Sequence, residues 1–140
     1  MKRRNFLIAL GVVPPLVFSS CGKDEFPSTP TVITGKVIDE NNKPVEGFEL
    51  QFSGYYQKGT SPVPIFDETG KTNNNGIYSI SYVVSGGQTT FLPGLNSKFN
   101  LVANYDLFVW KDNKYEFVGN PVGPIVYGQT NTFNFQLIKK

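Results

Sequence analysis

The sequence contains no histidine and only one cysteine, Cys21, among its 140 residues. The absence of histidine removes the commonest general base and the commonest metal ligand at once. A single cysteine allows neither an intramolecular disulfide nor a thiolate metal cluster. We therefore expect no catalytic residue, no cofactor and no metal site, and a domain that is stabilised by its hydrophobic core alone.

Charged residues are also scarce, at 17% of the chain, and the formal net charge of +2 is unevenly placed. Three of the 13 basic residues, Lys2, Arg3 and Arg4, lie at the N-terminus. Without them ten basic residues stand against 11 acidic ones, which gives a net charge of −1. No basic patch with interleaved aromatic residues remains, so we expect no nucleic-acid partner.

The apolar run at residues 6–18 is too short to span a bilayer, which takes about 20 residues. Pro14 and Pro15 also interrupt a helix within this run. A basic start followed by a short apolar run is typical of a signal peptide rather than of a membrane anchor. The sequence therefore predicts export from the cytoplasm.

The end of this run resembles the lipobox of bacterial lipoproteins, with an apolar residue and two small residues before the cysteine: Val17-Phe18-Ser19-Ser20-Cys21. The resemblance implies cleavage before Cys21, acylation of that cysteine, and the membrane as a partner through its lipid. Two or more acyl chains, at about 0.8 kcal/mol per buried methylene, anchor a protein stably. We predict a signal peptide at residues 1–20, the lipidated cysteine with a flexible linker at residues 21–30, and one domain at residues 31–140.

Two further resemblances concern the route and the destination of export. The Arg3-Arg4 pair is similar to the twin-arginine signature, although Lys2 stands where that signature has serine or threonine, so twin-arginine and general export both remain open. The Lys-Asp-Glu sequence at residues 23–25 is similar to the surface-export signal of lipoproteins in the Bacteroidetes. It implies an outer-membrane lipoprotein exposed on the cell surface, with a merely solvated linker and a periplasmic domain as the alternative.

From residue 31 onward, apolar and polar residues alternate with a period of two, which indicates half-buried strands. The pattern predicts strands at residues 31–39, 45–53, 77–84, 99–110, 115–118 and 130–138. Asparagine, glycine and proline predict turns and loops between them, at residues 39–44, 54–66, 73–76, 111–114 and 119–128. We expect an all-β fold: a single antiparallel, Ig-like β-sandwich of about seven strands.

The same alternation predicts which side chains form the core. Phe48, Leu50 and Phe52 share one face of a strand, and the polar residues between them share the other. Extending this pattern to the other strands predicts one core that contains Val37, Phe48, Leu50, Tyr78, Ile80, Phe133 and Phe135.

Three stretches resemble the carboxypeptidase regulatory-like domains: Gly35-Lys36-Val37-Ile38-Asp39, Pro44-Val45-Glu46-Gly47-Phe48, and Thr72-Asn73-Asn74-Asn75-Gly76-Ile77-Tyr78. The resemblance covers residues 31–85 and implies a prealbumin-like (transthyretin-like) sandwich. It implies no peptidase, because no peptidase domain is present, and the related transthyretin-like hydrolases rely on histidine. We expect structural roles for the motif residues: close backbone approach at Gly35, a turn at Pro44, and positive φ at Gly76.

Three functions are compatible with these features. The first is a non-catalytic accessory module that binds or presents a protein or glycan, and the aromatic residues available for glycan stacking are Tyr55, Tyr56, Phe108, Trp110 and Tyr127. The second is a structural partner of an outer-membrane complex that docks by a sheet edge. The third is a hydrolase that uses the carboxylates of Asp67 and Glu68 or of Asp106, although carboxylates in loops are usually only solvated. Among metals only calcium remains open, near residues 39–42 or 67–75, where loop oxygens are available.

Overall fold

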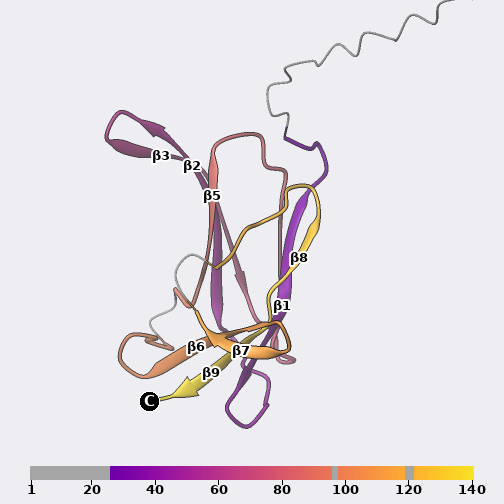
Figure 1. The fold of residues 1–140 in the computed structure, drawn as a ribbon, viewed down its shortest axis with the longest axis vertical. Coiled ribbons are helices and arrows are strands. Elements are labelled where there is room, and N and C mark those ends of the chain that lie inside the picture. The colour runs from indigo at the N-terminus through magenta and orange to yellow at the C-terminus, as the bar shows by residue number, and fades with distance from the viewer. Residues whose placement is uncertain (1–25, 96–97, 119–121) are drawn as a thin grey trace, which may run out of the picture.

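The computed structural model describes residues 26–95, 98–118 and 122–140, which form nine β-strands in two facing sheets (Figure 1). Within these residues there is no helix at all, and so none that is long and apolar enough to cross a bilayer. The strands are β1 (Thr31–Asp39), β2 (Glu49–Lys58), β3 (Ser61–Lys71), β4 (Ile77–Tyr82), β5 (Gln88–Pro93), β6 (Tyr105–Lys111), β7 (Lys114–Phe117), β8 (Thr130–Thr132) and β9 (Phe135–Lys139).

The larger sheet has the order β4-β1-β9-β6-β7, with β8 also paired to β1, and the smaller sheet has the order β3-β2-β5. The predicted all-β sandwich is confirmed, with nine strands instead of about seven. Most pairings are antiparallel, but β8 and β9 both run parallel to β1. The last two strands of the chain thus lie next to the first strand in the larger sheet.

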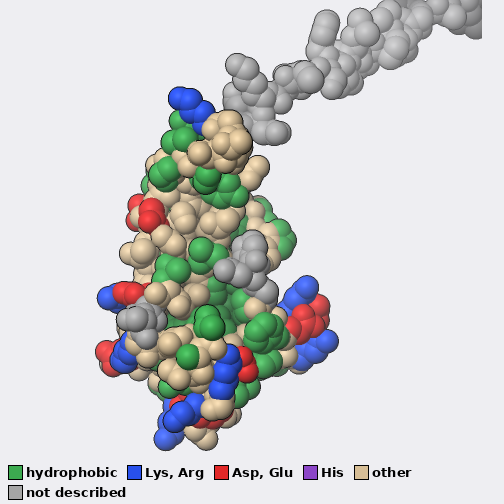
Figure 2. Space-filling model, turned by 90° about the vertical axis from the view of Figure 1, so that its left-hand side faces the viewer, with side chains coloured by type: hydrophobic (Ala, Val, Ile, Leu, Met, Phe, Trp, Pro, Cys, Tyr) green, Lys and Arg blue, Asp and Glu red, His purple; other side chains and the backbone are tan. Residues whose placement is uncertain are grey.

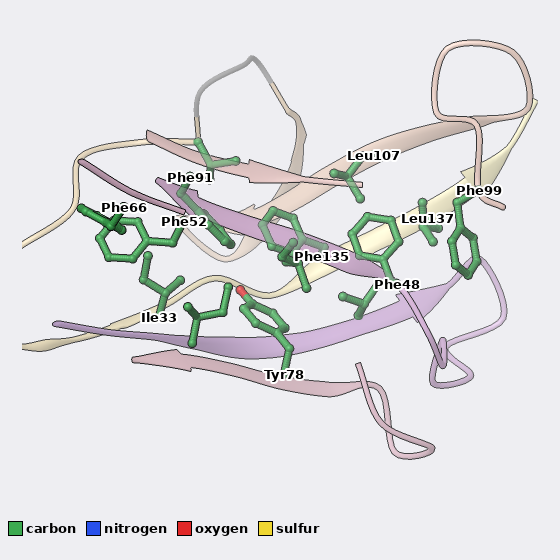
Figure 3. Packing of buried hydrophobic residues seen from close by; sticks show 14 of the residues in the cluster. Ile33, Phe48, Phe52, Phe66, Tyr78, Phe91, Phe99, Leu107, Phe135 and Leu137 are labelled. Atoms are coloured by element: carbon green, nitrogen blue, oxygen red, sulfur yellow. The ribbon is translucent and has the colours of Figure 1, made fainter. Parts of the chain in front are cut away.

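The core lies between the two sheets and consists mainly of aromatic and branched aliphatic side chains (Figure 3). Leu50 on β2 and Phe48, which precedes that strand, point from the smaller sheet toward Tyr78 and Phe135 of the larger sheet. All four side chains are at most 1% exposed. The predicted core residues are buried as expected except Phe133, which is partly buried and packs against the cluster. The period-two pattern therefore identified the inward face correctly.

The stretch at residues 54–66, which we expected to be a loop, instead continues β2 and begins β3 as a long hairpin. The prediction was wrong because Pro62 and Pro64 were read as strand breakers. They lie on β3, an edge strand, which has a partner strand on one side only. A proline whose nitrogen faces the open side therefore costs no hydrogen bond to a neighbouring strand. A two-residue turn pairs Lys58 with Ser61, so alternation places both prolines at positions that do not bond to β2.

Three other features differ from the prediction. Strand β5 was missed, and the strand expected at residues 99–110 begins only at Tyr105. Asn100 has a positive φ of 22°, and its backbone and side-chain oxygens accept hydrogen bonds from the N–H of Ala103, which makes residues 100–104 a turn. The expected last strand, residues 130–138, is divided into β8 and β9 by Phe133 and Asn134.

The motif residues of the family resemblance have structural roles. A Cβ on Gly35 would collide with the carbonyl oxygen of Phe133, so only glycine permits this approach. The buried hydroxyl of Thr72 accepts a hydrogen bond from the Phe48 N–H and donates one to the Val45 carbonyl, at 2.9 and 2.6 Å. Gly76 has a φ of 73°, as its turn requires.

The described chain begins against the domain rather than apart from it. The Phe26 ring lies 5.2 Å from the Tyr127 ring, and the Thr29 hydroxyl donates a hydrogen bond to the Gly128 carbonyl at 3.2 Å. These contacts hold residues 26–30 at the end of the sandwich where β1 starts (top of Figure 1). Strands β6, β7 and β9 lie toward the opposite end.

Candidate functional site at the β6–β7 hairpin

The hairpin of β6 and β7 forms one edge of the larger sheet, and two hollows lie beside it, lined in part by its inward residues Leu107 and Val109 and in part by Trp110 and Phe117. One hollow of about 470 Å³ lies between the hairpin, the end of β5 and the turn at residues 100–104. The other, of about 380 Å³, lies between the hairpin and the chain around Gly123 and Phe133. Hydrophobic side chains gather on this part of the surface, beside acidic and basic ones (lower half of Figure 2).

The opposite face of the hairpin carries four aromatic side chains, which we name the aromatic ladder: Phe108, Trp110, Tyr115 and Phe117. They form two directly opposed cross-strand pairs, Phe108 with Phe117 and Trp110 with Tyr115. The ring centroids lie 5.8 and 4.9 Å apart, and both pairs pack edge to face. Such cross-strand aromatic pairs stabilise a hairpin by about 0.2–1 kcal/mol each.

One ring of each pair is largely exposed to solvent. The side chains of Trp110 and Phe117 are 45% and 66% exposed, whereas Tyr115 and Phe108 are only partly exposed. Because each exposed ring packs against the edge or face of its partner, its orientation is fixed. The ladder is therefore an ordered aromatic surface rather than a set of freely rotating side chains.

A two-residue turn sets the register of the ladder. Asp112 and Asn113 have φ values of 50° and 63°, the left-handed pair that the favoured hairpin turn requires. Lys114 then forms an ion pair with Glu116 at 2.9 Å. The hydrogen bond and charge of Lys114 lower the pKa of the Glu116 carboxyl, and Glu116 raises the pKa of Lys114 in return. Both side chains are solvent-exposed, so the pair contributes little to stability.

Two side-chain amides border the ladder, that of Gln136 on β9 and that of Asn134 in the break just before β9. Gln136 is directly opposite Phe108 on the neighbouring strand. The backbone N–H of Trp110 donates a hydrogen bond to the backbone carbonyl of Asn134. The Asn134 Oδ1 atom accepts a hydrogen bond from the Lys36 N–H at 2.9 Å, and Gln136 Nε2 donates one to the Asp39 carbonyl at 3.3 Å. Within the described part of the chain this leaves Asn134 Nδ2 and Gln136 Oε1 without a partner.

The aromatic residues singled out in the sequence do not form one site. Tyr55 and Tyr56 lie on the β2–β3 hairpin, and Tyr127 packs on Phe26 while its hydroxyl bonds to that of Thr89. Only Phe108 and Trp110 belong to the ladder. The hairpin of residues 99–110 with residues 115–118 was predicted and is confirmed, but Tyr115 and Phe117 were not included among the aromatic residues available for binding.

The candidate carboxylates are not brought together. Asp67 accepts a hydrogen bond from Gln51, its neighbour Glu68 points to the other face of β3, and Asp106 forms an ion pair with Lys140 at 3.4 Å in the other sheet. One carboxylate oxygen of Asp39 caps its own turn by accepting from the N–H groups of residues 41 and 43. The described residues contain no group of three histidine, cysteine or acidic side chains close enough to hold a metal. Cys21, the predicted lipidation site, lies outside the described residues.

The sheet edges differ in how well they would pair with a partner strand. Edge strand β3 carries Pro62 and Pro64, which remove outward N–H donors and so oppose pairing. Edge strand β7 is only four residues long. The other two edge strands, β4 and β5, have six residues each, and β5 ends in Pro93 whereas β4 has no proline, so β4 would suit docking best among the described strands.

No family model matches the chain, and no curated protein matches it. A search of solved structures finds similarity to a 3-chlorocatechol 1,2-dioxygenase from Rhodococcus opacus 1CP, with a TM-score of 0.42 and 15% sequence identity. The similarity covers 84% of this chain and 62% of that one, so this chain spans less than two thirds of the enzyme's length. A similarity this weak carries no argument about activity.

Proposed function

We propose that this chain is a non-catalytic lipoprotein of the bacterial cell envelope, anchored in the outer membrane by lipid on Cys21. Its β-sandwich serves as an accessory module that binds or presents a partner at the cell surface. The lipobox-like sequence before Cys21 supports the anchor, and the absence of histidine from the whole sequence supports the lack of catalysis. The aromatic ladder is the surface we propose for binding.

The observation that carries this proposal is that the start of the described chain and the β6–β7 hairpin lie toward opposite ends of the domain. The first described segment, residues 26–30, lies at one end of the sandwich, and the β6–β7 hairpin lies toward the other (Figure 1). Five residues of fully extended chain span at most about 18 Å, so an acylated Cys21 would hold the Phe26 end near the membrane. The aromatic ladder would then face away from the lipid, toward solvent and partners.

The family resemblance agrees with such a role. We propose that the domain is related to the carboxypeptidase regulatory-like domains, which have a prealbumin-like sandwich. The close backbone approach at Gly35 and the positive φ at Gly76 are the features that the resemblance implies, and they support this relation. The Lys-Asp-Glu sequence at residues 23–25 supports surface exposure over a periplasmic orientation.

Replacement of Cys21 by alanine tests the anchor. In the native bacterium, Cys21→Ala should release the protein from the membrane fraction or leave its precursor uncleaved, because no acyl chain can be attached. Ser28→Ala, which keeps the cysteine, is the matched control and should stay in the membrane fraction. Cleavage of the domain by protease added to intact cells tests its surface exposure. If Cys21→Ala remained wholly in the membrane fraction, the lipid anchor would be refuted.

A further inference from the structure

We propose that the aromatic ladder binds a neutral glycan chain, with sugar rings stacked on Trp110 and Phe117. This inference names the partner of the proposed binding module and rests on that function. The aromatic ladder is not needed to fill the core. Leu107 and Val109 of the same strand already point inward and pack there, so the exposed rings lie on the outer face.

The charges around the ladder select an uncharged occupant. On the ladder's own face, Asp106 of β6 forms an ion pair with Lys140 at 3.4 Å. Strand alternation places Lys111, Lys114 and Glu116 on the other face of the hairpin, where Lys114 pairs with Glu116 at 2.9 Å. Neither an anionic nor a cationic ligand would therefore find net complementary charge on this surface.

The polar groups beside the rings match the edge of a sugar. One face of a pyranose ring carries C–H bonds that pack on an aromatic face, while its hydroxyl groups project sideways as donors and acceptors. Gln136 lies directly across from Phe108, and its Oε1 atom and the Nδ2 atom of Asn134 have no partner among the described residues. Beside a stacking surface, the amide oxygen can accept a hydrogen bond from a sugar hydroxyl, and the amide N–H can donate one to a sugar hydroxyl.

The size and the position of the ladder argue against the other occupants. Two ring pairs on a four-residue edge strand make a small surface, whereas a stable protein interface needs roughly 800 Å² on each partner. The hairpin also lies toward the end opposite residues 26–30, away from the proposed anchor, which favours an occupant in solvent over the bilayer. A sugar chain in solvent meets both conditions.

Trp110 is the chain's only tryptophan, so its fluorescence reports on this surface alone. The test is a titration of the full lipidated protein, in detergent, with neutral oligosaccharides of six sugars: malto-, cello-, xylo-, laminari- and mannohexaose. At least one should shift the Trp110 emission saturably, and its affinity should change little between 50 and 500 mM salt. Oligogalacturonate, which is anionic, should not bind.

Three variants locate the binding, measured by calorimetry so that no fluorophore is needed. Phe117→Ala and Trp110→Ala should each weaken binding at least tenfold, and Trp110→Phe should retain most of it because a ring is kept. Tyr56→Ala is the matched control, since Tyr56 is 46% exposed but lies on the β2–β3 hairpin. It should bind like the wild type. A single cooperative thermal transition in each variant shows that it is folded, and a modest drop in midpoint is expected where a cross-strand ring pair is lost.

The proposal is overturned if none of the neutral hexasaccharides binds to the folded protein, or if Phe117→Ala binds as well as the control. It is also overturned if only the anionic oligosaccharide binds, or if a cross-link from position 117 reaches a protein in intact cells while no sugar binds. That last result would keep the binding module and refute only the glycan. Loss of the anchor in the Cys21 experiment would instead refute the envelope function, independently of the sugar titration.

Discussion

The hydroxyl of Tyr78 donates a hydrogen bond to the carbonyl oxygen of Phe133 at 2.7 Å, from β4 to the break between β8 and β9. The break leaves this carbonyl outside the regular ladder, and the tyrosine supplies the missing partner. Gly35, between the two residues on β1, lacks the side chain that would block the contact. One hydrogen bond thus joins the first strand's two neighbours across the larger sheet.

Tyr78 makes the protein sensitive to alkali. Burial raises the pKa of its hydroxyl far above the ordinary value of 10, because the charged form would lose its hydration. Above pH 10 the unfolded chain releases this proton while the folded chain keeps it, so stability falls as pH rises, by at most about 1.4 kcal/mol per pH unit. Urea unfolding at pH 9, 10 and 11 should show this slope. It should be much smaller in Tyr78→Phe but unchanged in Tyr55→Phe; equal slopes in all three proteins would contradict the assignment.

Gly35→Ala should destabilise the domain through steric overlap alone. The new Cβ would collide with the Phe133 carbonyl and crowd the Tyr78 hydroxyl, which forces β1 and the β8–β9 break apart at a cost of about 1–3 kcal/mol. Gly86→Ala is the control, because nothing lies within 4 Å of its Cβ position. Chemical denaturation should show a lower midpoint for Gly35→Ala and a midpoint near the wild type for Gly86→Ala. A neutral Gly35→Ala would mean that the two strands are not in close contact.

Leu50→Ala tests the register of β2. Leu50 is fully buried, so truncation should cost about 2–5 kcal/mol from lost burial and the cavity left behind. Leu95→Ala removes the same atoms from a side chain that is 47% exposed and should cost about 0.5 kcal/mol or less. Urea unfolding of both variants gives the comparison, and similar costs at the two positions would show that the inward face has been misassigned.

Removal of metal should leave the protein unchanged. The best remaining calcium candidate, Asp39, already uses one carboxylate oxygen to accept hydrogen bonds from its own turn. The melting temperature of the purified processed protein should therefore be the same in about 5 mM EDTA as in buffer. This EDTA concentration exceeds the dissociation constants of calcium sensors by a factor on the order of 10³. A drop in EDTA that excess calcium reverses would show a structural calcium site that we did not expect.

Local chemistry was enough to predict much of the fold. The alternation around Phe48 and Leu50 gave the inward face, and the Asn-Gly sequence at residues 75–76 gave the turn before β4, because both signals act within a few residues. The turn at residues 111–114 is likewise a local signal, and it sets the register that pairs Trp110 with Tyr115. Local patterns failed where the neighbour decides: Pro62 and Pro64 break a central strand but are tolerated on an edge.

The sequence by itself determined the class of fold and about half of the core, and it predicts the anchor at Cys21, since these depend on periodicity and a short linear motif. Only the tertiary structure decided that Phe66 and Phe91 join the core, that residues 26–30 lie at one end of the sandwich and the β6–β7 hairpin toward the other, and that Gln136 lies opposite Phe108. These relationships join residues that are far apart in the chain. They depend on the order in which strands pair, which no local pattern specifies because the same alternation fits several arrangements of the same strands.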